Sequence, residues 1–124
     1  MFSHVMLGAH DLEASKKFYD AALGALGYGP SMAQGDRHFY MTKTGVFAIS
    51  KPINGEPASA ANGSTIGFAV DSPEQGDAWH AAGIANGGTT CEDPPGIRES
   101  EMGKMYLAYM RDPSGNKICA LKRM

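Results

Sequence analysis

Apolar and polar residues alternate along several short segments of this chain, and this alternation predicts β-strands. Within residues 2–9, Val5 and Leu7 fall on one face of the predicted strand, while His4 and Met6 fall on the other. The same period of two predicts further strands over residues 37–42, 45–50, 65–70, 89–92, 105–111 and 116–121. Residues 93–104 are polar and carry mixed charges, so we expect them to form a loop.

Two segments show helical spacing behind an N-capping residue instead. Asp11 precedes apolar positions that recur every three or four residues, and this pattern predicts a helix that ends at Gly24 to Gly27. Ser72 precedes a proline and then a glutamine three residues after the cap, which together indicate the start of a second helix. We expect this second helix to end at Ala82, before Gly83.

The predicted elements follow the same order in both halves of the chain. His4 and Thr65 occupy equivalent places in the first strand of each half, and Tyr40 mirrors Tyr109. Module one covers about residues 1–52 and module two about 64–124, and the linker between them (53–63) is rich in Pro, Gly, Ser and Ala. Because neither half is large enough to bury a core alone, we predict a single α+β domain of two pseudo-repeated modules.

Composition and charge narrow the function classes. The 124 residues include 16 Gly and 7 Pro, and 11 Lys and Arg stand against 13 Asp and Glu, which argues against nucleic acid as a partner. No apolar run approaches the roughly 20 residues of a membrane helix, and no secretory leader is visible, so we expect no membrane partner. The only cysteines are Cys91 and Cys119, which favours the reducing cytoplasm.

Three motifs resemble the vicinal oxygen chelate superfamily, which includes glyoxalase I, bleomycin-resistance proteins and extradiol dioxygenases. They are His4-Val-Met-Leu at the start, His10-Asp-Leu-Glu through Phe18-Tyr19, and Asp112-Pro-Ser-Gly-Asn near the end. The resemblance implies βαβββ modules whose curled mixed sheets enclose a cavity, and a homodimer that completes it. It also implies a divalent metal that is bound by histidine and glutamate and that chelates two adjacent substrate oxygens.

The resemblance places the four metal-ligand positions of that superfamily at four residues of this chain, and most of these residues are not metal ligands. The four residues are His4, Ala48 (or Ser50 if the register slips by two residues), Thr65 and Cys119. Among them His4 is a strong ligand, and Cys119 can ligate only as a thiolate. A catalytic metal centre usually has three protein ligands, so we expect the family's metal site to be incomplete here. The cofactor is left open, with a divalent metal on His4 and Cys119 as one alternative.

Further residues are candidates for contact with a ligand in the cavity. Met6 shares a strand face with His4, whereas His38 and Tyr40 share a face for which cavity lining and core packing both stay open. In the predicted loop, Arg98 is placed to clamp an anionic group. The full set of predicted ligand contacts is Met6, His38, Tyr40, Ser50, Thr65, Arg98 and Tyr109.

The resemblance leaves two functions open. One is binding of a small polar metabolite in the inter-module cavity, with lyase or isomerase chemistry at an α-hydroxycarbonyl and His4 as metal ligand or general base. The other is a metal-free binding protein that sequesters a drug or metabolite. The missing carboxylates favour sequestration, and the retained His4 favours chemistry.

Overall fold

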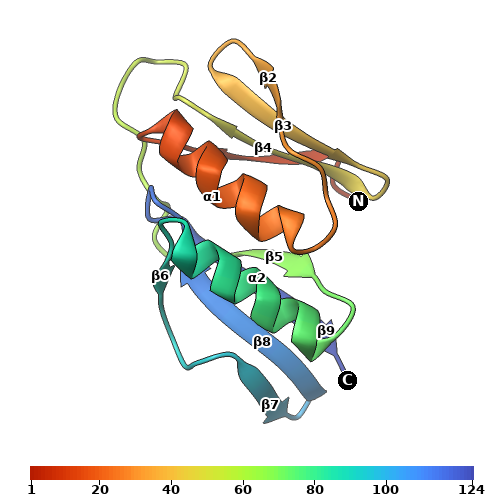
Figure 1. Ribbon diagram of the computed structural model, residues 1–124. Coiled ribbons are helices and arrows are strands. Elements are labelled where there is room, and N and C mark those ends of the chain that lie inside the picture. Colours follow the sequence, from red (N-terminus) through yellow and green to blue (C-terminus); the bar gives the residue numbers. More distant parts are fainter.

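Two helices lie side by side and cover one face of two separate mixed sheets (Figure 1). The computed structural model describes residues 1–124. In chain order the elements are β1 (His4–Gly8), α1 (Leu12–Gly24), β2 (Met32–Gln34), β3 (Arg37–Thr42), β4 (Gly45–Ser50), β5 (Ile66–Ala69), α2 (Pro73–Ala85), β6 (Thr89–Thr90), β7 (Gly96–Ser100), β8 (Gly103–Arg111) and β9 (Lys117–Arg123).

The two sheets repeat one topology. Module one forms the order β1-β4-β3-β2, and module two forms β5-β9-β8-β6, with β7 pairing β8 as well. In each sheet the first strand runs parallel to the last strand of its module, and the other pairs are antiparallel. This confirms the predicted α+β fold with paired modules. The sheets remain separate and do not close into a barrel, so the expected enclosed cavity is instead open.

Capping side chains begin both helices as the sequence predicts. Asp11 Oδ1 accepts a hydrogen bond from the backbone N–H of Ala14 at 3.1 Å, and Ser72 Oγ accepts one from Gln75 at 3.1 Å. The predicted end of α2 is wrong, because the helix continues through Gly83 to Ala85. A Cβ at Gly83 would lie 2.2 Å from Met110 Cε, so this glycine permits close packing of α2 on β8.

The segment predicted as a polar loop contains a strand. β7 pairs with β8 in an antiparallel register that places Arg98 opposite Met105. Its charged residues suit an edge strand, which has one side open to solvent. β2 was also absent from the prediction, because its three residues are too few to show an alternation.

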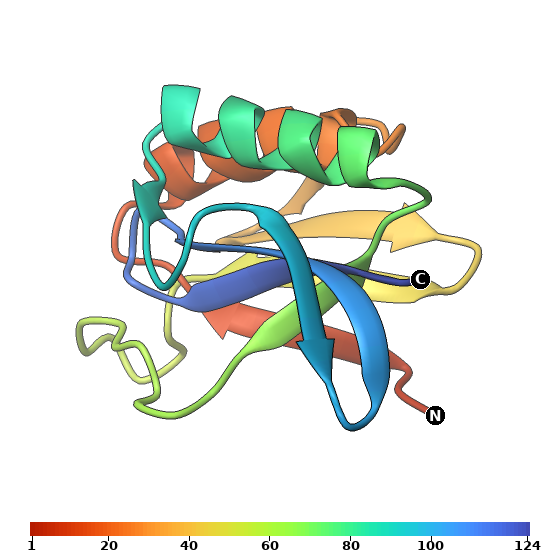
Figure 2. The same cartoon turned by 90° about the horizontal axis from the view of Figure 1, so that it is seen from below.

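The core lies between the helices and the sheets and is shared by both modules. Aromatic rings connect the modules: Phe47 of module one and Phe68 of module two have centroids 5.2 Å apart, and Tyr19 extends the cluster within module one at 4.7 Å from Phe47. Figure 2 shows both helices on one side of the sheets. We call the opposite side of each sheet its helix-free face. Neither helix is long and apolar enough to cross a membrane.

Candidate functional site

A narrow cleft of about 230 Å³ lies between the two modules and contains His4. Its walls come from the starts of β1 and β4, from β5 and from the end of α1. Most of the lining is apolar, including Val46, Phe47, Ile66 and Phe68. Its polar side chains are His4, Thr42 and Thr44, together with two tyrosines. A mostly apolar cleft with a few polar side chains is a common form of small-molecule site.

His4 is the first residue of β1 and lies on the helix-free face of module one. Val5 and Leu7 pack against the core, and because side chains alternate along a strand, His4 projects the other way. The imidazole is exposed, and its Nδ1 lies 2.8 Å from Ser3 Oγ. No protein group bonds to Nε2, so this nitrogen is free to contact a ligand.

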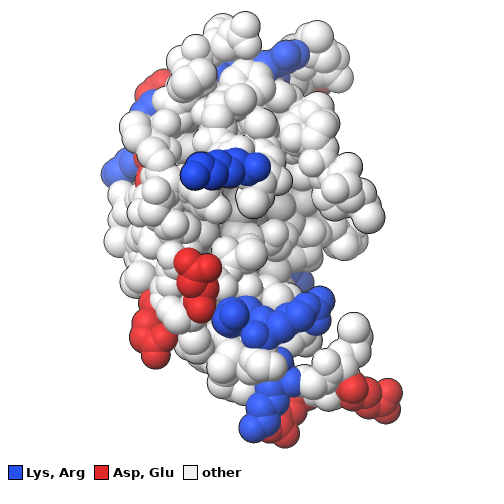
Figure 3. All heavy atoms as spheres, turned by 90° about the vertical axis from the view of Figure 1, so that its right-hand side faces the viewer, with Lys and Arg blue, Asp and Glu red and all other residues white.

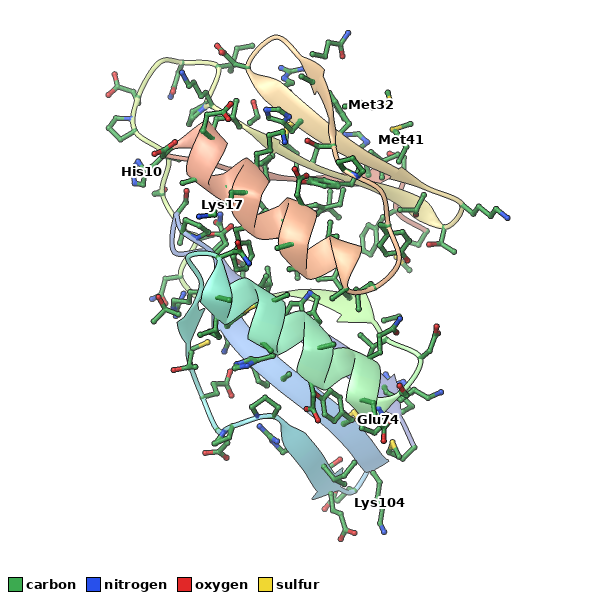
Figure 4. All side chains as sticks on the ribbon, in the orientation of Figure 1. His10, Lys17, Met32, Met41, Glu74 and Lys104 are labelled. Atoms are coloured by element: carbon green, nitrogen blue, oxygen red, sulfur yellow. The ribbon has the colours of Figure 1, made fainter.

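The helix-free face of module one is rich in methionine. Met6 pairs with Ala48 on β4, and Ala48 pairs with Phe39 on β3, so the three side chains form one row across the sheet. Met32 and Met41 extend this apolar surface, and each is 62% exposed. Figure 4 shows these two methionines close together on β2 and β3.

Ser50 lies at the other end of β4 from His4. β1 and β4 are parallel, with His4 opposite Val46 and Gly8 opposite Ser50. Four residues of strand therefore separate the two positions, about 13 Å at 3.3 Å per residue. Ser50 is buried, donates a hydrogen bond to the carbonyl of Lys51 at 2.7 Å, and lines a separate polar hollow of about 890 Å³.

His38 and Tyr40 lie on the helix-covered face, where Tyr40 packs in the core and His38 lines a hollow beside the start of α1. His38 is buried, and its Nδ1 lies 2.9 Å from Ser31 Oγ. Tyr40 donates a hydrogen bond to Asp20 Oδ1 at 2.7 Å, and burial, reinforced by this bond, raises the pKa of Tyr40. Tyr40 still reaches the wall of the cleft, whereas His38 does not.

Tyr109 lies on the helix-free face of its sheet, whereas Tyr40 lies on the helix-covered face. Tyr109 pairs with Cys119 on the helix-free face of module two, while its neighbour Met110 packs in the core. The predicted match of Tyr40 to Tyr109 is therefore wrong, because one side chain points toward the helices and the other away from them. Burial raises the pKa of Tyr109, and the ring centroid lies 5.0 Å from Lys117 Nζ.

Arg98 is held by backbone groups of its own segment. It lies in β7, and its guanidinium donates to the carbonyls of Gly96 and Asp93, each at 3.1 Å. The expected placement of Arg98 in a loop is therefore wrong.

The positions expected to hold a metal do not fit one within this chain. His4 lies on the first sheet and Cys119 on the second, with Ala48 and Thr65 at the other two positions. Burial raises the pKa of the Cys119 thiol, which disfavours the thiolate that a metal requires. No three His, Cys, Asp or Glu side chains come close enough together to hold an ion.

Two basic residues near Thr65 were not predicted to belong to a site. Thr65, Arg111 and Lys117 line a third hollow, of about 270 Å³. Lys117 also pairs with the carboxylate of Glu92. Side chains alternate between the two faces along residues 105–111 and 116–121, and this alternation places Arg111 and Lys117 on the same face of the paired strands. Their convergence with Thr65 depends on strand order, which the sequence alone does not give.

Comparison with known proteins identifies the family. The model of the Glyoxalase/Bleomycin resistance protein/Dioxygenase superfamily matches residues 1–120. The chain belongs to this superfamily. A glyoxalase/bleomycin resistance protein from Albidiferax ferrireducens is 67% identical, with 99% of each chain covered and a TM-score of 0.97. The comparison with curated proteins gave no match.

More distant superfamily structures share the fold at low identity. A glyoxalase-related enzyme from Fulvimarina pelagi is 20% identical, with a TM-score of 0.75 over 98% of this chain and 86% of that one. Lactoylglutathione lyase from Agrobacterium tumefaciens is 19% identical, with a TM-score of 0.67 over 98% and 92%. At this identity the similarity shows the fold alone.

Proposed function

We propose that this superfamily member binds a small molecule in the inter-module cleft, with His4 as its polar contact. The observation that carries the proposal is the free Nε2 of His4 in a mostly apolar cleft built from both modules. The mostly apolar walls favour a ligand with an apolar body and a few polar groups, which is less polar than the metabolite expected from the sequence.

The surface around the cleft agrees with such a ligand. Figure 3 views the molecule from the side of the N-terminus and the β3–β4 turn, where the cleft residues Thr44 and Gly45 lie. Uncharged atoms cover most of this side, and charged side chains gather mainly toward its lower end. An apolar ligand would therefore meet few charged groups that need to be desolvated.

Sequestration without a metal is the form of this function that the residues favour. His4 has no carboxylate or second imidazole beside it to complete a metal site. The second candidate is lyase or isomerase chemistry at an α-hydroxycarbonyl, which the free Nε2 of His4 supports, because a general base needs an unpaired nitrogen.

Native mass spectrometry and metal titration would separate these candidates. Protein prepared without chelator should carry a small organic molecule, and His4→Ala should retain about tenfold less of it. Calorimetric titration with nickel, zinc and manganese should give no stoichiometric binding. His10→Ala is the matched control, because His10 is exposed and lies outside the cleft. Stoichiometric metal that is lost in His4→Ala would overturn sequestration in favour of the metalloenzyme.

We also propose that the protein is a homodimer in which a partner covers a helix-free face. The exposed Met32 and Met41 beside Phe39 support this, since an apolar sheet face of this kind is costly to leave in water. For localisation we propose the reducing cytoplasm, which is supported by the free thiols of Cys91 and Cys119.

A further inference from the structure

The hollow beside Thr65 is built from two strands and the end of the linker. Arg111 on β8 and Lys117 on β9 are directly paired, and both lie on the helix-free face of module two. Residues 60–65 form the other wall of the hollow. All of its lining therefore comes from module two and the linker, and it does not depend on what the His4 cleft binds.

The charges that line this hollow are positive. Arg111 and Lys117 are its only ionisable lining residues, and no acidic side chain takes part. The guanidinium of Arg111 donates to the neutral carbonyl of Gly115 at 2.8 Å and forms no salt bridge. Lys117 contacts Glu92, whose carboxylate lies outside the lining, so the site keeps an excess of positive charge.

Neutral donors stand next to the two cations. The side chains of Asn62 and Thr65 line the hollow and form no hydrogen bond with the protein. The Ser64 hydroxyl already donates to the carbonyl of Ala61 at 3.0 Å. An amide and a hydroxyl together with Arg and Lys form a set dominated by donors, which matches a group that only accepts hydrogen bonds.

We propose that this hollow binds a small oxyanion, either free phosphate or the phosphate or carboxylate group of a metabolite. Its volume of about 270 Å³ accommodates such a group with several waters, at roughly 30 Å³ per water. Arg111 presents a planar fork that matches two oxygens, and Lys117 adds a point charge. The bound anion would share the Lys117 ammonium with Glu92.

An NMR titration of the whole protein tests the site. Inorganic phosphate added at constant ionic strength should shift the backbone amide signals of residues 62–65, 111 and 117 in a saturable way. Acetate in a parallel titration shows whether a carboxylate is accepted as well: saturable shifts at the same amides assign the site to both anions, and their absence assigns it to phosphate.

Substitutions distinguish specific phosphate binding in this hollow from general electrostatic attraction. Arg111→Gln should weaken phosphate binding by about tenfold. Arg123→Gln should leave it unchanged, because Arg123 carries the same charge on β9 but contacts Met105 instead of the hollow. If Arg111→Gln alters the amide spectrum beyond its own surroundings, Thr65→Val replaces it as the test and should weaken binding as well. Shifts that do not saturate, or equal losses in Arg111→Gln and Arg123→Gln, would overturn the proposal.

Discussion

The phenol of Tyr19 donates a hydrogen bond of 2.7 Å to Asp112 Oδ2 and so connects α1 of module one to the β8–β9 turn of module two. Both side chains are buried. The other oxygen of Asp112 accepts the backbone N–H groups of Ser114 and Asn116, each at 2.9 Å. Asn116 Nδ2 in turn donates to the carbonyl of Gly8 at 2.9 Å. The Asp-Pro-Ser-Gly-Asn motif therefore forms a turn and also connects the two modules through hydrogen bonds.

Tyr19→Phe should lower the free energy of unfolding by about 1.5–3 kcal/mol, because the buried Asp112 carboxylate loses a donor. Urea unfolding followed by circular dichroism measures this change. Tyr28→Phe is the control, since Tyr28 is exposed and forms no side-chain hydrogen bond. Equal stability of Tyr19→Phe and Tyr28→Phe would contradict the role given to the Tyr19–Asp112 bond.

Stability should fall as the pH rises above about 10, the usual tyrosine pKa. Burial raises the pKa of Tyr19, Tyr40 and Tyr106, and hydrogen bonds to Asp112, Asp20 and Asp77 respectively add to the shift. Above this pH the unfolded phenols ionise while the native ones keep their protons. The native state then binds more protons than the unfolded state, so each rise in pH favours unfolding.

Urea unfolding at several pH values between 9 and 11 measures this slope. Tyr106→Phe should make the dependence of the unfolding free energy on pH less steep by up to roughly 1.4 kcal/mol per pH unit, which corresponds to one proton. The comparison of this variant with the unaltered protein cancels the contributions of lysines and cysteines. Identical slopes for the two proteins would show that the Tyr106 phenol ionises normally in the native state.

Two helical glycines should respond oppositely to alanine. At Gly76 a Cβ would lie 2.1 Å from Tyr106 Cε1, so Gly76→Ala should destabilise the protein by about 1–3 kcal/mol. At Gly24 nothing lies within 4 Å of the added atom, so Gly24→Ala should be neutral or stabilising by about 0.5 kcal/mol. Thermal melts of both variants test the pair, and a stable Gly76→Ala would show that Tyr106 can move aside.

Much of the fold was predictable because local signals determine it. Asp11 and Ser72 cap the first turns of the two helices. The alternation of apolar and polar residues identifies the longer strands. β7 was missed because an edge strand can be polar, and the end of α2 was misplaced because Gly83 serves close packing.

The candidate site was less predictable because it depends on which face a side chain occupies. A shift of one residue in comparing the modules placed Tyr40 with Tyr109, although one lies under α1 and the other on the helix-free face. Strand order, which sequence spacing does not reveal, also separates Ser50 from His4 and brings Arg111 and Lys117 next to Thr65.

The proposed dimer should weaken when charge enters the apolar surface of module one. Met41→Lys should raise the dimer dissociation constant at least tenfold, because burying an unpaired ammonium is costly. Met102→Lys introduces the same charge at an exposed residue between β7 and β8 and should leave the dimer intact. Sedimentation velocity over a range of concentrations measures both. A monomer at every concentration would contradict the dimer.

Ligand binding against His4 is the central claim, and protein-observed NMR with a fragment library tests it most directly. The library should contain aromatic, aliphatic and α-hydroxycarbonyl compounds. We expect the bound fragments to shift the signals of His4, Gly67 and Phe68 together, and His4→Gln to weaken those that carry a polar group. Fragments that gather only in the polar hollow around Ser50 and Arg37, or that bind His4→Gln equally well, would contradict the claim.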